Sequence, residues 1–184
     1  MKKIAVPVQG TNVSAHFGHA PQFKIFSVED KNIVGEDVLE NPGHQPGLLP
    51  RLLNEAGADL EINEDNVICN KVDSLKKTDI VTYYYPGFPT DLQQPFSVFL
   101  TKCEGKSKIE EKIYENRFMH VPYLEKMGAN IAIKGQKAFV EGPTALKGSE
   151  VTATDLRAGA ALVIAGLIAK GKTQINEVEH ILRG

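Results

Sequence analysis

One acidic residue and three arginines stand out in this sequence because their side chains suit the binding and activation of an anionic ligand. Asp91 follows a Pro/Gly-rich turn, where a carboxylate can hold a hydroxyl group by a hydrogen bond or accept its proton. The planar guanidinium of arginine donates two parallel hydrogen bonds to a phosphate or a carboxylate. The arginines are Arg117, Arg157 and Arg183. These four residues predict a cleft for an anionic ligand.

The same residues also have a structural interpretation, and the residue types alone leave both readings open. Thr90-Asp91 and Thr154-Asp155 can each cap the start of a helix and complement its dipole, and for Asp155 we favour this role. Arginines in most domains are solvated or paired with surface acids. His120 is expected to pack or to form a hydrogen bond rather than to react.

The segments that carry these residues occur twice. The sequence Leu53–Ile62 reappears in altered form as Leu124–Ile133, with the Gly-Ala pair at the same place in both. Three further pairs keep the same order along the chain: Thr90-Asp91-Leu92 with Thr154-Asp155-Leu156, Gly105-Lys106 with Gly171-Lys172, and Arg117 with Arg183. The spacing of the copies is typical of repeated small α/β units rather than of a thin solenoid.

Runs of β-branched and aromatic residues, separated by Gly and Pro breakers, predict a mixture of strands and helices. Strands are predicted over residues 4–8, 23–28, 33–39, 60–62, 67–70, 80–84, 108–114, 131–133, 138–141, 150–154 and 173–181. Helices are predicted over residues 48–56, 91–103, 119–127 and 156–170, with Thr90 as the N-cap of the second. The expected fold class is α/β.

Three segments of the sequence carry a resemblance to a known family. They are Tyr85–Gln93, Tyr114–Pro122 and Ala153–Leu162. Over residues 48–184 the chain resembles the enolpyruvyl transferases, in particular the UDP-N-acetylglucosamine 1-carboxyvinyltransferases of peptidoglycan synthesis. The resemblance implies an inside-out α/β barrel of repeated units, of which about two units of the C-terminal domain are present.

The resemblance also implies substrates and roles for individual residues. The substrates would be UDP-N-acetylglucosamine and phosphoenolpyruvate, with no cofactor. Asp91 and Arg183 would be catalytic, Asp91 towards a sugar hydroxyl and Arg183 towards phosphoenolpyruvate, while Ile113 and Arg117 would bind substrate. Arg157 is added to the substrate-binding residues because of its residue type and its place in the repeat. The catalytic cysteine loop and the other domain of the family have no counterpart in the sequence, so this polypeptide alone is expected not to turn over substrate.

The first part of the chain resembles a different family. The segments Lys3–Val8, Val13–Phe23 and Glu40–Pro50 are similar to the dinitrogenase iron-molybdenum cofactor biosynthesis proteins, which have a ribonuclease H-like topology. The resemblance covers residues 1–58 and makes a non-enzymatic carrier of iron-sulfur or iron-molybdenum cofactors the alternative function. Histidine ligands suit iron and zinc, and the candidates are His16, His19 and His44.

The two resemblances predict a hybrid of two segments, residues 1–47 and residues 48–184, with the seam within residues 47–62. A natural recombinant, an engineered chimera and an artefact without function all remain open.

Composition limits the classes of partner. With 21 Lys and Arg against 23 Asp and Glu, the net charge of −2 provides no field that would attract nucleic acid or an anionic membrane. Cys69 and Cys103 lack the spacing of a zinc site, so no metal site is assigned, and both are expected to be buried thiols in a soluble cytoplasmic protein. An incomplete last unit would leave a strand edge and apolar helix faces uncovered, so self-association or marginal stability is expected.

Overall fold

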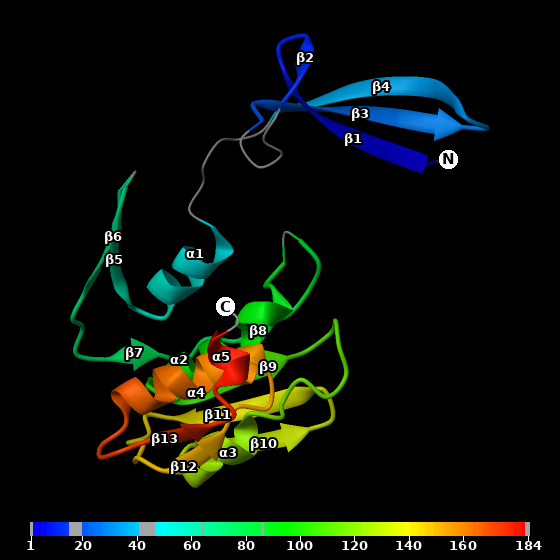
Figure 1. Ribbon diagram of the computed structural model, residues 1–184. Helices are drawn as coiled ribbons and strands as arrows, with labels where there is room; N and C mark the ends of the chain where they lie inside the picture. The colour runs from blue at the N-terminus through cyan, green and yellow to red at the C-terminus, as the bar shows by residue number, and fades with distance from the viewer. Residues whose placement is uncertain (1, 15–19, 41–46, 64, 86, 183–184) are drawn as a thin grey trace. The chain divides into compact units, whose positions relative to one another are not determined.

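The computed structural model describes residues 2–14, 20–40, 47–63, 65–85 and 87–182. The chain divides into two compact units, residues 1–47 and residues 48–184 (Figure 1). Four residues named above, His16, His19, His44 and Arg183, lie outside the described residues. None of the helices in the described residues has the length and apolar character that crossing a bilayer requires.

The described part of the first unit is an antiparallel sheet with the strand order β2-β1-β3-β4 (Figure 1). Its strands are β1 (Lys2–Gln9), β2 (Asn12–Val13), β3 (Gln22–Glu29) and β4 (Asn32–Glu40). The strands predicted over residues 4–8, 23–28 and 33–39 are confirmed as β1, β3 and β4. The tight turn from β3 to β4 uses Asp30 and Lys31 at positive φ, a conformation that matches the twist of a hairpin.

The second unit mixes helices and strands. Its helices are α1 (Leu48–Glu55), the short 3-10 helix η1 (Thr90–Leu92), α2 (Gln93–Leu100), α3 (Val121–Lys126), α4 (Leu156–Ile168) and α5 (Glu179–Leu182). Its strands are β5 (Asp59–Ile62), β6 (Val67–Asn70), β7 (Leu75–Lys76), β8 (Ile80–Val81), β9 (Cys103–Glu110), β10 (Asn130–Lys134), β11 (Lys137–Gly142), β12 (Glu150–Thr152) and β13 (Gln174–Asn176).

The duplication seen in the sequence is present in the backbone. Gly57 after α1 and Gly128 after α3 both have positive φ, 92° and 99°, a conformation that glycine adopts without strain. The next residue then bonds back into the helix in both copies, from Ala58 N–H to the Leu53 carbonyl and from Ala129 N–H to the Leu124 carbonyl, each at 2.9 Å. An antiparallel hairpin follows each turn, β5-β6 in the first copy and β10-β11 in the second.

The second half of each copy is a strand-helix-strand unit with parallel strands. In the first copy β8 pairs with β9 and α2 connects them, whereas in the second β12 pairs with β13 and α4 connects them. Connections of this kind need a crossover of a dozen or more residues, which a helix supplies. The two connecting helices, α2 and α4, pack against each other in the same layer (Figure 1).

Strand β9 is the centre of the larger sheet. It pairs with β11 on one side, and with β7 and β8 on the other. Buried apolar side chains from the helices and the sheet form one core, whose fully enclosed members include Leu100 of α2, Ile109 of β9, Leu124 of α3 and Leu162 of α4. This core fixes the ends of β8 and β9, where the candidate site lies.

Some predicted boundaries were wrong. Cys103, predicted as helical, begins β9 because it pairs with Leu75 of β7, a contact that no local pattern reveals. The last predicted strand, over residues 173–181, ends at Asn176, since Glu177 has a φ of 56° and residues 179–182 turn into α5. The predicted hairpin over residues 131–133 and 138–141 is confirmed as β10-β11. Of the two cysteines predicted to be buried, Cys103 is buried, whereas Cys69 lies in the hairpin strand β6 and is exposed.

Candidate functional site

Asp91 and Arg157 are brought together from the two copies. Asp91 lies in η1 and Arg157 in the first turn of α4, and Arg157 Nε donates to Asp91 Oδ1 at 2.5 Å. The Asp91 side chain is 64% exposed and that of Arg157 33%, so the pair lies at the surface. The packing of α2 against α4 explains this contact, because each residue lies at the start of one of these helices or just before it.

Asp155 has the structural role predicted for it. Its Oδ1 accepts hydrogen bonds from the backbone N–H groups of Arg157 at 2.8 Å and Ala158 at 3.2 Å, which makes it the N-cap of α4. Capping satisfies two of the N–H groups that a helix leaves unpaired at its start.

The prediction that Thr90 caps the following helix was wrong. The N-cap residues of η1 and α2, Pro89 and Leu92, form no side-chain cap, and the Thr90 hydroxyl donates instead to Glu111 Oε2 at 2.9 Å. Thr90 is the first residue of the 3-10 turn η1, and its hydroxyl points to the end of β9. Thr90-Asp91 and Thr154-Asp155 are therefore alike in sequence and different in hydrogen bonding.

Glu111 follows β9 and is the most connected side chain of the site. It is 1% exposed, and its carboxylate accepts four hydrogen bonds from residues on three segments. Oε1 accepts from the Thr82 hydroxyl at 2.7 Å, the Ile113 N–H at 2.9 Å and the Tyr114 N–H at 3.1 Å, while Oε2 accepts from Thr90. Hydrogen bonding of this extent is what allows a carboxylate to be buried.

Arg117 lies on the loop after Glu111, beside a hollow of about 720 Å³. Its guanidinium stacks over the Tyr114 ring, 4.3 Å from the centroid, and its backbone carbonyl accepts a hydrogen bond from Gln94 Nε2 at 3.2 Å. The hollow is lined by Glu111, Tyr114, Glu115, Asn116, Arg117, Phe118, Met119, Ile133, Gly135 and Gln136. A guanidinium held against a ring at the edge of a hollow can bind an anionic group that enters it.

His120 is buried behind this loop, as the sequence analysis predicted for a residue that packs or forms hydrogen bonds. Its exposure is 0%, and Nε2 lies 2.8 Å from the Ser97 hydroxyl of α2. Burial lowers the pKa of His120 to about 4, against a smaller raising effect of the Asp155 carboxylate and the Arg117 backbone. The imidazole is therefore neutral near pH 7 and supports the loop from inside.

The cleft predicted from four residues is only partly present, because Arg117 lines the hollow whereas Asp91 and Arg157 do not, and Arg183 lies outside the described residues. Asp91 touches Arg157 directly, and the segments that hold Asp91 and Arg117 meet at Glu111. Ile113 is half-buried and takes part through its backbone N–H, without lining the hollow.

Sequence reasoning missed Glu111 and Thr82, although both had a signal. Each comes just after a strand, β9 and β8, and these strands are parallel neighbours, so their ends meet at one edge of the sheet. That edge is where α/β sheets commonly place functional groups.

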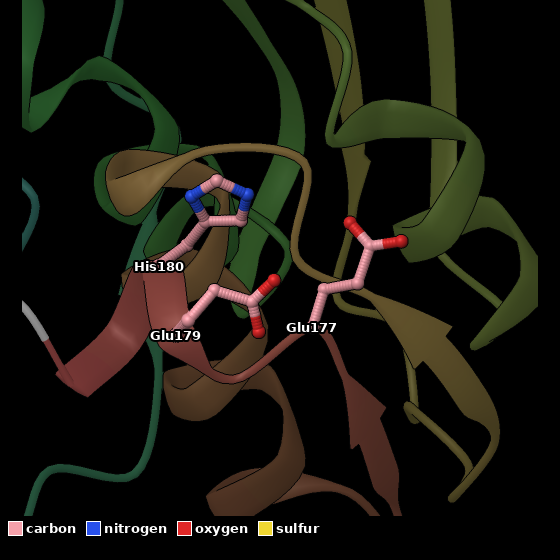
Figure 2. A group of neighbouring side chains, drawn as sticks. All are labelled: Glu177, Glu179 and His180. Atoms are coloured by element: carbon pink, nitrogen blue, oxygen red, sulfur yellow. The ribbon is translucent and has the colours of Figure 1, made fainter.

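Three donor groups also gather near the end of the described chain. The ligand atoms of Glu177, Glu179 and His180 lie within 4.8 Å of one another, and Figure 2 shows the three side chains. Both glutamates are exposed and the histidine is half-buried. Exposed acidic groups commonly gather without an ion, and no second feature of the described residues points to a metal there, so this cluster is not assigned as a site.

Taken together, two copies of a helix-hairpin unit followed by a strand-helix-strand unit define an α/β fold of the enolpyruvyl transferase type. The chain belongs to the EPSP synthase (3-phosphoshikimate 1-carboxyvinyltransferase) family, whose model matches residues 26–184. Among solved structures, the enolpyruvyl transferase NikO from Streptomyces tendae matches with a TM-score of 0.69 and 29% identity, over 74% of this chain and 32% of that one. The EPSP synthase from Acinetobacter baumannii, at 16% identity and a TM-score of 0.51, shares the fold over 70% of this chain and 31% of that one.

Curated relatives show higher identity. The chain is 52% identical over 154 residues to UDP-N-acetylglucosamine 1-carboxyvinyltransferase 2 of Listeria monocytogenes, a match that covers 84% of this chain and 36% of that protein. It is 51% identical over 152 residues to the protein of the same name from Geobacillus kaustophilus, covering 82% and 35%. The chain therefore spans about a third of the length of these relatives.

The family match begins earlier than the sequence analysis expected. It starts at residue 26, within β3, and so includes β4, whereas the resemblance to the enolpyruvyl transferases was placed from Leu48 onward. The comparisons give no support to the resemblance of residues 1–58 to the cofactor biosynthesis family.

Proposed function

We propose that residues 48–184 supply one face of an enolpyruvyl transferase site, which binds UDP-N-acetylglucosamine and phosphoenolpyruvate. The observation that carries this proposal is the 52% identity over 154 residues to a UDP-N-acetylglucosamine 1-carboxyvinyltransferase. The contacts support it, because the segments that hold Asp91 and Arg117 meet at Glu111, just after β9, and Arg157 bonds to Asp91.

Each residue has a role that its contacts allow. Asp91 uses Oδ1 for Arg157, and no partner of Oδ2 is found among the described residues, so Oδ2 is available to a sugar hydroxyl. Arg117 provides positive charge at the edge of the hollow for the anionic part of the nucleotide sugar. We place Ile113 beside this part of the ligand and Arg183 near phosphoenolpyruvate, on the resemblance alone.

In the proposed reaction the sugar hydroxyl oxygen bonds to the central carbon of phosphoenolpyruvate, and the bond from that carbon to the phosphate oxygen breaks. The hydroxyl proton passes to a base, for which we propose Asp91, and inorganic phosphate leaves. Such a transfer requires both substrates to be enclosed away from water. For the part of the site that these residues supply, which spans about a third of the relatives' length, we propose ligand binding.

Titration calorimetry with UDP-N-acetylglucosamine tests the binding. Saturable binding by the chain is expected, and Arg117→Ala is expected to weaken it about tenfold, as removal of one charge-assisted contact does. Arg51→Ala is the matched control, because Arg51 is an exposed arginine of α1 that pairs only with Glu55 among the described residues. The proposal fails if the chain does not bind, or if both arginine variants weaken binding equally.

For the first unit, we propose a separate domain, residues 1–47, with its boundary to the transferase-like unit within residues 47–62; the family match, which begins at residue 26, gives no support to a separate origin. The support for a separate domain is the compactness of residues 1–47 and the purely antiparallel sheet, which differs from the strand-helix-strand units that follow. No observation favours a cofactor-carrying role, since the three histidines concerned lie outside the described residues. Absorbance titration of the chain with ferrous iron checks this, and a saturable signal lost in His16→Ala would restore the carrier hypothesis.

A further inference from the structure

The buried carboxylate of Glu111 is bonded to segments on both sides of the candidate site. Its Oε2 accepts from Thr90, the residue before Asp91, and its Oε1 accepts from the Ile113 and Tyr114 N–H groups at the start of the loop that ends in Arg117. The backbone N–H of Glu111 donates to the Gln136 carbonyl at 2.9 Å, which adds the turn between β10 and β11. One residue thus connects segments that are distant in sequence, three of them through its side chain and the turn through its backbone.

The chemistry of this carboxylate suits a fixed connection. Hydrogen bonds to an ionised acceptor are shorter and stronger than neutral ones, and they gain further strength in a buried environment. Thr82 extends the connection, because its hydroxyl donates to Glu111 at 2.7 Å and accepts from the Lys112 N–H at 2.9 Å. Each bond fixes one donor group relative to the end of β9, so the two loops cannot shift independently while all of them are intact.

We propose that Glu111 is a positioning residue that holds Asp91 and Arg117 in one relative geometry. The proposal rests on the function proposed above, in that both residues face the same ligand. Glu111 acts through the residues bonded to it, since its own oxygens are occupied. Its neighbour Glu110 is the contrast, because its carboxylate is 21% exposed and, within the described parts of the chain, forms only long ion pairs with Lys108, Lys112 and Lys137, at 3.7 to 3.8 Å.

Three variants of the whole chain test this: Glu111→Ala, Glu111→Gln and the matched control Glu110→Ala. The first readout needs no ligand and is amide hydrogen exchange of Ile113 and Tyr114 followed by NMR. We expect exchange about tenfold faster in Glu111→Ala, because the acceptor of both N–H groups is lost. In Glu111→Gln the amide oxygen can accept the same bonds and its NH2 group can donate to Thr90, so exchange should stay within about threefold of the unmodified chain.

The second readout is the affinity for UDP-N-acetylglucosamine, expected to fall about tenfold in Glu111→Ala, to be largely restored in Glu111→Gln and to be unchanged in Glu110→Ala. A folded Glu111→Ala chain with unchanged exchange at Ile113 and Tyr114 overturns the proposal, as does an equal effect of Glu110→Ala. If the unmodified chain does not bind the nucleotide sugar, the proposed function fails, and the exchange data still decide whether Glu111 positions the loops.

A further variant covers the case in which Glu111→Ala does not fold. Thr90→Val removes only the bond on the Asp91 side and keeps the size of the side chain. We expect a changed NMR shift of the Asp91 amide and a several-fold loss of affinity, with Ile113 and Tyr114 still protected. An unchanged Asp91 amide shift in Thr90→Val, with unchanged affinity, overturns the proposal.

Discussion

The two copies of the Thr-Asp-Leu segment differ in what their acidic residues do. Asp155 in the second copy caps α4 with hydrogen bonds to two backbone N–H groups. Asp91 in the first copy caps nothing, because its segment forms a 3-10 turn ahead of α2, and its carboxylate reaches across to Arg157. The same short sequence thus stabilises a helix in the second copy, through Asp155, and leaves Asp91 of the first copy exposed at the candidate site.

The difference arises from long-range partners rather than from the segment itself. In the first copy the Thr90 hydroxyl donates to Glu111, which follows β9, and so does not cap the helix that follows. In the second copy the Thr154 hydroxyl is buried without a partner among the described residues. The neighbouring Asp155 caps α4. A repeat therefore conserves the path of the backbone more strictly than the roles of equivalent side chains.

The largest effect is expected at His120, where the two copies meet. Ser97 of the first copy bonds its ring, and the Asp155 carboxylate of the second raises its pKa, but burial has the greater effect and the pKa falls from 6.5 to about 4. The unfolded chain therefore binds a proton between these values that the folded chain excludes. Stability is fully present above about pH 6.5 and is lost as the pH falls towards 4, by up to roughly 3 kcal/mol.

Urea unfolding at about pH 7 and about pH 4.5 measures this loss, and His120→Gln is the control because it cannot be protonated. The variant is expected to be less stable near neutral pH and to depend less on pH. Equal losses of unfolding free energy in both proteins over this interval would mean that His120 does not contribute.

The next effect compares the two acids directly. Asp155→Ala removes a helix cap and is expected to lower the unfolding free energy by about 1 kcal/mol. Asp91→Ala removes an exposed side chain that caps nothing, so its effect should stay within about 0.5 kcal/mol. Thermal unfolding of both variants checks the contrast. Equal destabilisation by the two substitutions would show that Asp91 has a structural role equivalent to that of Asp155.

Local features of the fold were predictable from the sequence. Gly57 and Gly128 follow helices at equivalent places, and both have the positive φ that ends a helix in this way. The hairpin of β10 and β11 was predicted because its alternation and its turn lie close together in the chain. These signals need only a few neighbouring residues to act.

The site was less predictable because its contacts join residues far apart in sequence. Threonine is a favourable N-cap residue, and no residue close to Thr90 in the sequence indicates that its hydroxyl donates to Glu111 instead. The sequence does not distinguish Glu111 from the other charged residues of a stretch rich in lysine and glutamate. The pairing of Asp91 with Arg157 depends on the packing of α2 against α4, which the repeat pattern does not specify.

The smallest effect concerns that pair. Arg157 lies in the first turn of α4, where the helix dipole disfavours a positive charge, and Asp91 offsets this. A double-mutant cycle of Asp91→Ala and Arg157→Ala should give a coupling of about 0.5 kcal/mol, as for other exposed pairs. The coupling should fall towards zero between about 0.01 M and about 1 M salt, since the pair is screened. A coupling that persists at high salt would indicate that the two groups are bonded more tightly than their exposure implies, and that the acid of the first copy also contributes to stability.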